Sequence, residues 1–282
     1  MNRNRGARPT QVVTMVVAVI LVAGALAACS SGQKSGAKSN PKANTTSGAN
    51  AGELVGLFRL TPGAAKGNQI TGTWFRMVQP GGTAAHGPYM INANSRADGG
   101  QVTLLKPGTS GGLRTEGYQS EPTPAFDSGG HSLADAITTP TPFFGVNFSI
   151  STNRVDPQTK AAVAPPTVTL KDGKLTADLA AWSASWNKQN FNQGAPKPVP
   201  NTAAKAPGQE KAQRVWDWVA GKYLDAAPKP TVTGSAATGT FDPKTRAFVL
   251  QWTSHIEGGP FNGFTGLWHL EGIFEPGKRA PG

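Results

Sequence analysis

The sequence predicts an all-β protein, an antiparallel sandwich or partly open barrel whose strands are joined by long loops rich in proline and glycine. Composition is the first reason. Of 282 residues 35 are glycine and 23 are proline, and only 15% are charged, which suits short strands and turns better than a helical bundle. The second reason is that short aromatic and aliphatic runs recur between turn signals. We expect about 8–12 strands between Glu53 and Phe274.

The strands of the N-terminal half differ in how clearly they are marked. Residues 54–60 and 69–78 are rich in aromatic and aliphatic side chains, and a Pro-Gly turn lies between them. Residues 101–105 are a weaker candidate, because loops with several prolines lie on both sides. Residues 143–150 are expected to form one strand that carries on one face Phe144, Val146, Phe148 and Ile150.

The clearest hairpin follows in the second half of the chain. Its turn is Asp172-Gly173, and its strands are expected at residues 167–170 and 175–186. Asp-Gly is a favoured pair for a two-residue turn because both positions need positive φ.

A second hairpin joins residues 238–241 to residues 247–256, and a last strand is expected at 264–274. A shift of 70 residues aligns the two hairpins and places Trp182 on Trp252. This similarity indicates either a structural repeat or a coincidence of the biased composition.

One helix is expected near residues 210–224, where apolar and charged side chains separate onto two faces at helical spacing. Trp216 and Trp218 also fit the alternation of a strand, so a strand remains the alternative there. The preceding residues 194–209 are mostly proline, alanine and lysine and have the composition of a linker-like insert.

The formal net charge of +11 is spread along the chain instead of gathered in one segment. A nucleic-acid-binding protein would cluster its basic residues on one face or interleave them with aromatic residues. The sequence therefore predicts no nucleic-acid partner, and we interpret the charge as attraction to anionic lipid or wall polymer.

The first residues have the pattern of an export signal. Arg3, Arg5 and Arg8 precede an apolar run at 12–25 that is too short to span a bilayer, and Leu26-Ala27-Ala28-Cys29 follows. Leu-Ala-Ala-Cys resembles the lipobox of bacterial lipoproteins. The resemblance implies that Cys29, the single cysteine of the chain, becomes the diacylated first residue, anchored at the extracytoplasmic face of the cell membrane. The composition also resembles that of GC-rich actinobacterial proteins.

A domain organisation follows from that cleavage site. Residues 1–28 form the signal peptide, and residues 29–52 form the lipidated cysteine and a flexible tether, which has no aromatic, large aliphatic or acidic residue. Residues 53–276 form a single β-rich extracytoplasmic domain, and residues 277–282 a disordered tail. We expect the domain to be a monomer held by core packing and sheet hydrogen bonds, since it has no cysteine for a disulfide.

Gly108-Thr109-Ser110-Gly111-Gly112 fits the letters of a G-x-S-x-G nucleophile elbow. That chemistry needs a strand, a sharp turn and then a helix, so that the serine is exposed. More loop follows residue 117 instead of a helix, so a flexible hairpin tip is the competing interpretation. A hydrolase that uses Ser110 remains an alternative function.

A metal site is the other catalytic possibility. Alternation along two neighbouring strands would present two histidines and two carboxylates on the face opposite their tryptophans, a set that zinc accepts. An ordinary solvated sheet face explains the same pattern, and no H-x-x-x-H or H-E-x-x-H spacing is present. No other cofactor is indicated. The candidate ligands are His255, Glu257, His269 and Glu271.

The seven tryptophans are the main ligand-binding candidates. One tryptophan buries about 150–250 Å², so several of them would form the core between sheets. The other interpretation is an aromatic cavity or platform for an acyl chain, a glycolipid or a sugar ring. The residues assigned to it are Trp182, Trp186, Trp252 and Trp268.

No nucleophile, base and orienting residue can be assigned together from the sequence. This favours a non-catalytic envelope lipoprotein over an extracytoplasmic hydrolase. Its ligand would be apolar, a glycolipid or a saccharide, or its partner would be another envelope protein.

Overall fold

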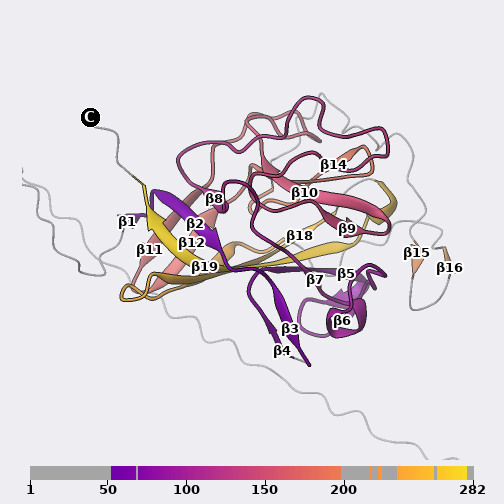
Figure 1. Cartoon of the computed structure of the whole chain (residues 1–282), viewed down its shortest axis with the longest axis horizontal. Helices are drawn as coiled ribbons and strands as arrows, with labels where there is room; N and C mark the ends of the chain where they lie inside the picture. The colour runs from indigo at the N-terminus through magenta and orange to yellow at the C-terminus, as the bar shows by residue number, and fades with distance from the viewer. Residues whose placement is uncertain are drawn as a thin grey trace, which may run out of the picture. The chain divides into compact units, whose positions relative to one another are not determined.

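The computed structural model describes residues 52–67, 69–197, 216–217, 222–223, 234–256 and 259–277, all within one compact unit, Ser47–Gly282. Over these residues the chain forms strands and two short 3-10 helices, η1 (Ala97–Gly100) and η2 (Gly259–Phe261), and no α-helix. The all-β class is thus confirmed (Figure 1). Cys29 and the residues predicted to form the signal peptide and the tether, up to residue 51, lie outside the described residues.

The largest sheet is antiparallel and has eleven strands. Its main path runs β1-β11-β12-β17-β18-β19-β2-β8, while β5 pairs with β19, β6 and β7. The strands are β1 (Gly52–Glu53), β2 (Gly56–Leu60), β5 (Trp74–Thr83), β6 (Gly87–Tyr89), β7 (Thr103–Leu104), β8 (Gly112–Arg114), β11 (Thr167–Lys171), β12 (Lys174–Asp178), β17 (Ala237–Phe241), β18 (Ala247–His255) and β19 (Thr265–Pro276).

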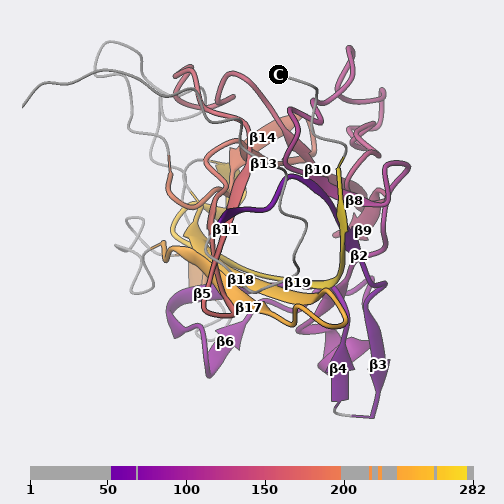
Figure 2. The same cartoon turned by 90° about the vertical axis from the view of Figure 1, so that its left-hand side faces the viewer.

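This large sheet curls into a half-barrel, and a second antiparallel sheet lies across its concave side (Figure 2). The order of the second sheet is β14-β13-β10-β9. Two short hairpins complete the described chain, β3–β4 and β15–β16. The bounds are β9 (Thr141–Phe143), β10 (Val146–Thr152), β13 (Trp182–Trp186), β14 (Gln189–Asn192), β3 (Ala64–Lys66), β4 (Gln69–Thr71), β15 (Trp216–Asp217) and β16 (Lys222–Tyr223).

The core fills the space between the two sheets. Successive side chains of a strand point to opposite faces, and along β18 and β19 the even-numbered positions point inward. Their side chains are at most 4% exposed at Phe248, Leu250, Trp252, Trp268, Leu270 and Phe274. β10 and β13 supply the opposite layer, mainly through Phe148, Ile150, Trp182 and Trp186.

The expected helix near 210–224 is not found at the residues that the structure describes there. Trp216–Asp217 and Lys222–Tyr223 pair as the antiparallel strands β15 and β16. At these four positions, the alternation of the two tryptophans therefore predicted the structure better than the helical spacing did. The other residues of the segment lie outside the described ones.

Two segments that were each predicted as one strand are interrupted by a turn. Residues 143–150 do not form one strand, because Phe144 and Gly145 have φ values of 51° and 75° and make a tight turn between β9 and β10. Residues 175–186 do not form one strand either. The chain turns after Asp178, where its carboxylate accepts the Ala180 N–H at 3.0 Å.

The turn after Asp178 also shows whether the 70-residue similarity of the two hairpins is a structural repeat. β11, β12, β17 and β18 are indeed neighbours in one sheet. Trp252 stays in this sheet on β18, whereas Trp182 lies after the corner, on β13 of the second sheet. The two tryptophans are therefore not equivalent members of a repeat but face each other across the core.

The segment predicted as a linker-like insert begins inside the folded body. Gly194 and Ala195 are buried, and the Ala195 carbonyl accepts the Leu179 N–H at 2.9 Å. The described part of this segment is thus packed structure, and residues 198–209 lie outside the described ones.

Candidate functional site

Three of the four candidate tryptophans form one cluster in the middle of the core. Trp182 is edge-on to Trp252 and Trp268, with ring centroids 5.2 and 5.7 Å away, while Trp252 and Trp268 are stacked at 6.1 Å. All three are at most 1% exposed. This part of the tryptophan set is core packing between the two sheets.

Gln193 holds the cluster together by hydrogen bonds. Its backbone carbonyl accepts the Trp252 indole N–H at 2.9 Å, and its side-chain Oε1 accepts the Trp268 indole N–H at 3.2 Å. The side-chain amide rests on Gly266, where an added Cβ would lie 2.1 Å from Oε1. A glycine in this strand therefore makes the space that the glutamine fills.

A buried polar loop fixes the position of Gln193. The preceding residue, Asn192, donates from Nδ2 to Asp156 Oδ1 at 2.7 Å, and its backbone N–H donates to Gln158 Oε1 at 2.7 Å. Asp156 is 1% exposed, and its other oxygen accepts the Thr159 N–H. Buried polar groups that are satisfied in this way hold one conformation.

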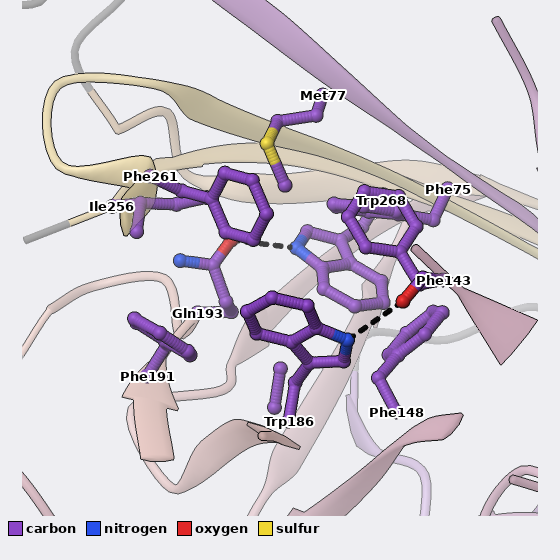
Figure 3. A pocket seen from close by; sticks show the side chains of 11 residues that line it. Phe75, Met77, Phe143, Phe148, Trp186, Phe191, Gln193, Ile256, Phe261 and Trp268 are labelled. Atoms are coloured by element: carbon purple, nitrogen blue, oxygen red, sulfur yellow. Dashed lines mark hydrogen bonds between the residues drawn. The ribbon is translucent and has the colours of Figure 1, made fainter. Parts of the chain in front are cut away.

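Next to the cluster, between the two sheets, lies an aromatic recess of about 40 Å³ (Figure 3). Two of the candidate tryptophans line it, Trp186 and Trp268, and two do not. Among the described residues of its wall, Gln193 is the single polar one. The full lining is Phe75, Met77, Phe143, Phe148, Ala184, Trp186, Phe191, Gln193, Ile256, Phe261 and Trp268.

The recess approaches the surface on the side of η2. Trp186, Phe261 and Phe191 keep 9, 8 and 6% exposure, in contrast to the central tryptophans. Trp186 is fixed here by its indole N–H, which donates to the Phe143 carbonyl at 2.8 Å (Figure 3). Its ring also packs on Phe261, with centroids 5.1 Å apart.

Phe144 is a strained residue beside this opening. A bulky side chain rarely adopts positive φ, yet Phe144 has φ of 51°. Its ring contacts Phe143 and Phe261, with centroids 5.1 and 6.3 Å away. Strain of this kind persists only where the surroundings enforce it, and it concentrates at functional sites.

Of the predicted metal ligands that the structure describes, His269 and Glu271 lie close together, but His255 does not join them. His255 pairs with Thr265, whereas His269 pairs with Gln251, so the two histidines lie on one face but four residues apart along the ladder, roughly 13–14 Å. No group of three or more His, Cys, Asp or Glu in the described ranges is placed to hold a metal ion. Glu257 lies outside the described residues.

His269 has a different environment from the one predicted. Its ring stacks on Trp74 with a centroid distance of 4.7 Å and an angle of 5°, and its Nδ1 lies 3.2 Å from Gln251 Oε1. Burial lowers the pKa of His269, and the carboxylate of Glu271, 3.7 Å from Nε2, opposes that shift. Glu271 also accepts the Gly72 N–H.

Ser110 does not stand on a nucleophile elbow. The turn is closed by the Gly111 N–H and the Gly108 carbonyl at 2.9 Å, and the strand β8 follows at Gly112–Arg114 instead of a helix. The Ser110 N–H donates to the Ala136 carbonyl at 2.9 Å. This segment is therefore the tip of a loop, which was the alternative to a nucleophile elbow.

The sequence reasoning missed most of the recess. Its phenylalanines and Gln193 come from several segments spread between residues 75 and 261, and no single spacing links them. The usable signal was limited to the alternation of Phe148 with Ile150 and to the abundance of tryptophan.

Within the described part of the chain, no helix is long and apolar enough to cross a membrane. No family model, curated protein or solved structure matches this chain.

Proposed function

We propose that the chain is a lipid-anchored, non-catalytic binding protein of the extracytoplasmic face of the cell membrane, and that its domain takes the alkyl end of an apolar ligand into the aromatic recess. The anchor is Cys29, in its Leu-Ala-Ala-Cys context. The absence of a nucleophile elbow at Ser110 supports the non-catalytic part.

The observation that carries the proposal is the wall of the recess. Ten of its eleven residues are apolar, they come from both sheets, and the outermost of them retain some exposure. Ligand sites are concave and mostly apolar with a few placed polar groups, and here Gln193 is the polar group. The strained Phe144 lies at the same opening.

The size of the recess decides which ligand fits. Its volume of about 40 Å³ is a few times the ~10–15 Å³ that a cavity needs to hold one water and far below the ~300–1,000 Å³ of a site that encloses a whole ligand. A sugar ring does not fit, whereas the end of an alkyl chain does. Each buried methylene contributes about 0.8 kcal/mol, so the rest of the ligand must bind outside the recess.

Quenching of tryptophan fluorescence by a bromine-tipped alkyl ligand, 12-bromododecanoate, tests this proposal. The protein is the mature chain with Cys29→Ser, so that no acyl chain of its own competes. We expect saturable quenching, because Trp186 and Trp268 line the recess.

A matched pair of variants locates the site. Ala184→Val adds two methyl groups to the recess wall and should weaken binding several-fold. Ala237→Val makes the same change at a buried strand position outside the recess and should not. Equal binding by both variants, or no saturable quenching of the parent protein, contradicts the proposal.

A further inference from the structure

A second hollow, unlike the recess, lies where β12 ends and β17 begins. This groove has a volume of about 610 Å³, within the range of small-molecule sites. Among the described residues that line it, there is no aromatic side chain other than a histidine and no large aliphatic side chain. Its lining is Thr167, Thr169, Thr176, Ala177, Asp178, Gly194, Ala195, Pro196, Lys197, Gly234, Ser235, Ala236 and His255.

One wall presents hydrogen-bonding groups that the fold does not use. Thr167 on β11 pairs directly with Asp178 on β12, and Thr176 lies two residues before Asp178 on the same face. Asp178 Oδ1 accepts the Ala180 N–H. Its Oδ2 and the hydroxyls of Thr167 and Thr176 have no hydrogen-bond partner among the residues that the structure describes.

Lys197, another lining residue, supplies a positive charge on a firm support. Lys197 Nζ donates to the Asn192 carbonyl at 2.8 Å, and Asn192 is fixed by Asp156. The lining also contains small residues, among them Gly194 and Gly234. A ring can approach the backbone closely at such residues, because no side chain intervenes.

These features select the class of ligand. An apolar ligand would find no large apolar side chain among the described residues of the groove. An extended peptide would need a free strand edge, but β11, β12 and β17 each have a paired strand on both sides. A carboxylate, two hydroxyls and an ammonium suit a ligand that donates and accepts hydrogen bonds in equal measure.

We propose that this groove is a binding site for a neutral saccharide, with Asp178 accepting from its hydroxyls and Lys197 donating to them. The site is separate from the aromatic recess and does not depend on an alkyl ligand binding there. Asp178 is the main contact, because hydrogen bonds to a charged group are stronger than those to a neutral hydroxyl.

Saturation-transfer NMR and titration with free maltotriose, cellotriose and mannotriose test the site on the mature chain with Cys29→Ser. At least one neutral trisaccharide should bind, and Asp178→Asn should weaken it by about tenfold. Asparagine retains the oxygen that accepts the Ala180 N–H, so the turn is preserved. Thr176→Val should weaken binding less.

The control is Thr240→Val, an exposed threonine of β17 that does not line the groove; it should leave binding unchanged. Circular dichroism confirms that each variant is folded. The proposal is overturned if no trisaccharide binds, if Asp178→Asn binds as well as the parent, or if an anionic sugar such as galacturonic acid trimer binds more tightly than every neutral one.

Discussion

Gln193 and Gly266 form a pair whose interdependence can be measured. The Gln193 amide occupies the space over Gly266 and accepts the Trp268 indole N–H. A Cβ added at Gly266 would lie 2.1 Å from Gln193 Oε1 and 2.9 Å from Trp268 Nε1. Gly266→Ala must therefore displace the amide and leave the indole donor buried without a partner.

The contacts of these two residues indicate how much each substitution should lower the free energy of unfolding. Gly266→Ala adds overpacking of about 1–3 kcal/mol to an unsatisfied buried donor of about 1–3 kcal/mol. Gln193→Ala leaves the same Trp268 donor unsatisfied and opens a cavity. In the double variant the new methyl group fills part of that cavity, and the donor is lost only once. The double variant should therefore cost at least about 1 kcal/mol less than the sum of the single ones.

Urea unfolding followed by circular dichroism gives the four free energies of unfolding of this cycle. Gln193→Ala combined with Thr240→Ala serves as the control, because Thr240 is exposed on the outer face of β17, and that pair should be additive within about 0.5 kcal/mol. If Gly266→Ala and Gln193→Ala are also additive, the amide does not depend on the glycine and the reasoning fails.

Three further outcomes are expected. Trp182→Ala and Trp252→Ala should each lower the free energy of unfolding by about 3–5 kcal/mol in urea titrations, because both rings are fully buried; a negligible cost at either position would falsify the packing account. Cys29→Ala should abolish incorporation of radiolabelled fatty acid, and label that still enters the protein would contradict lipidation there. Burial lowers the pKa of His269, so the folded state favours the neutral ring. Its contribution to stability is complete above the unfolded value of about 6.5 and is lost as pH falls from there through the lowered folded pKa. His269→Gln should flatten the pH dependence of unfolding below about 6.5, and an unchanged slope would count against this.

Turn chemistry explains why one hairpin was predicted and another was missed. Asp172-Gly173 and Phe144-Gly145 both have positive φ at two successive residues, 50° and 74° in the first and 51° and 75° in the second. The dipeptide Asp-Gly indicates such a turn in the sequence, because it is favoured where both residues need positive φ. Phenylalanine does not; the Phe144 ring contacts Phe143, its neighbour in the chain, and Phe261, which comes from a distant segment.

The corner after Asp178 was hidden for a related reason. Residues 179–181 are Leu-Ala-Ala, with neither glycine nor proline to mark a turn. The turn depends on the Asp178 side chain and on the Trp182 N–H, which donates to the Leu179 carbonyl at 2.9 Å. A local pattern therefore extended the strand, whereas the actual chain crosses to the second sheet.

At the candidate sites, the alternation of residues predicts which face of a sheet a side chain occupies, but it does not predict the register in which two strands pair. Alternation along β18 and β19 placed His255 and His269 on the same face, as the structure has it. The distance between them depends on the register, which the turn between the strands sets, and residue alternation carries no information about it. The recess poses the same difficulty, because Phe75 and Phe191 meet only through the packing of two sheets.

The strand β1 has a mechanical consequence for an anchored protein. Gly52 and Glu53 pair with β11 at the edge of the large sheet, and the Leu54 N–H adds one hydrogen bond to Val168. If the chain is anchored at Cys29 as proposed, a force applied from the N-terminal side loads these few bonds first, because β2 behind them is paired on both sides, with β19 and β8. Peeling residues 52–54 from the edge would release about 10 Å of chain. The domain would thus yield to a pull while its core, the aromatic recess and the groove remained intact.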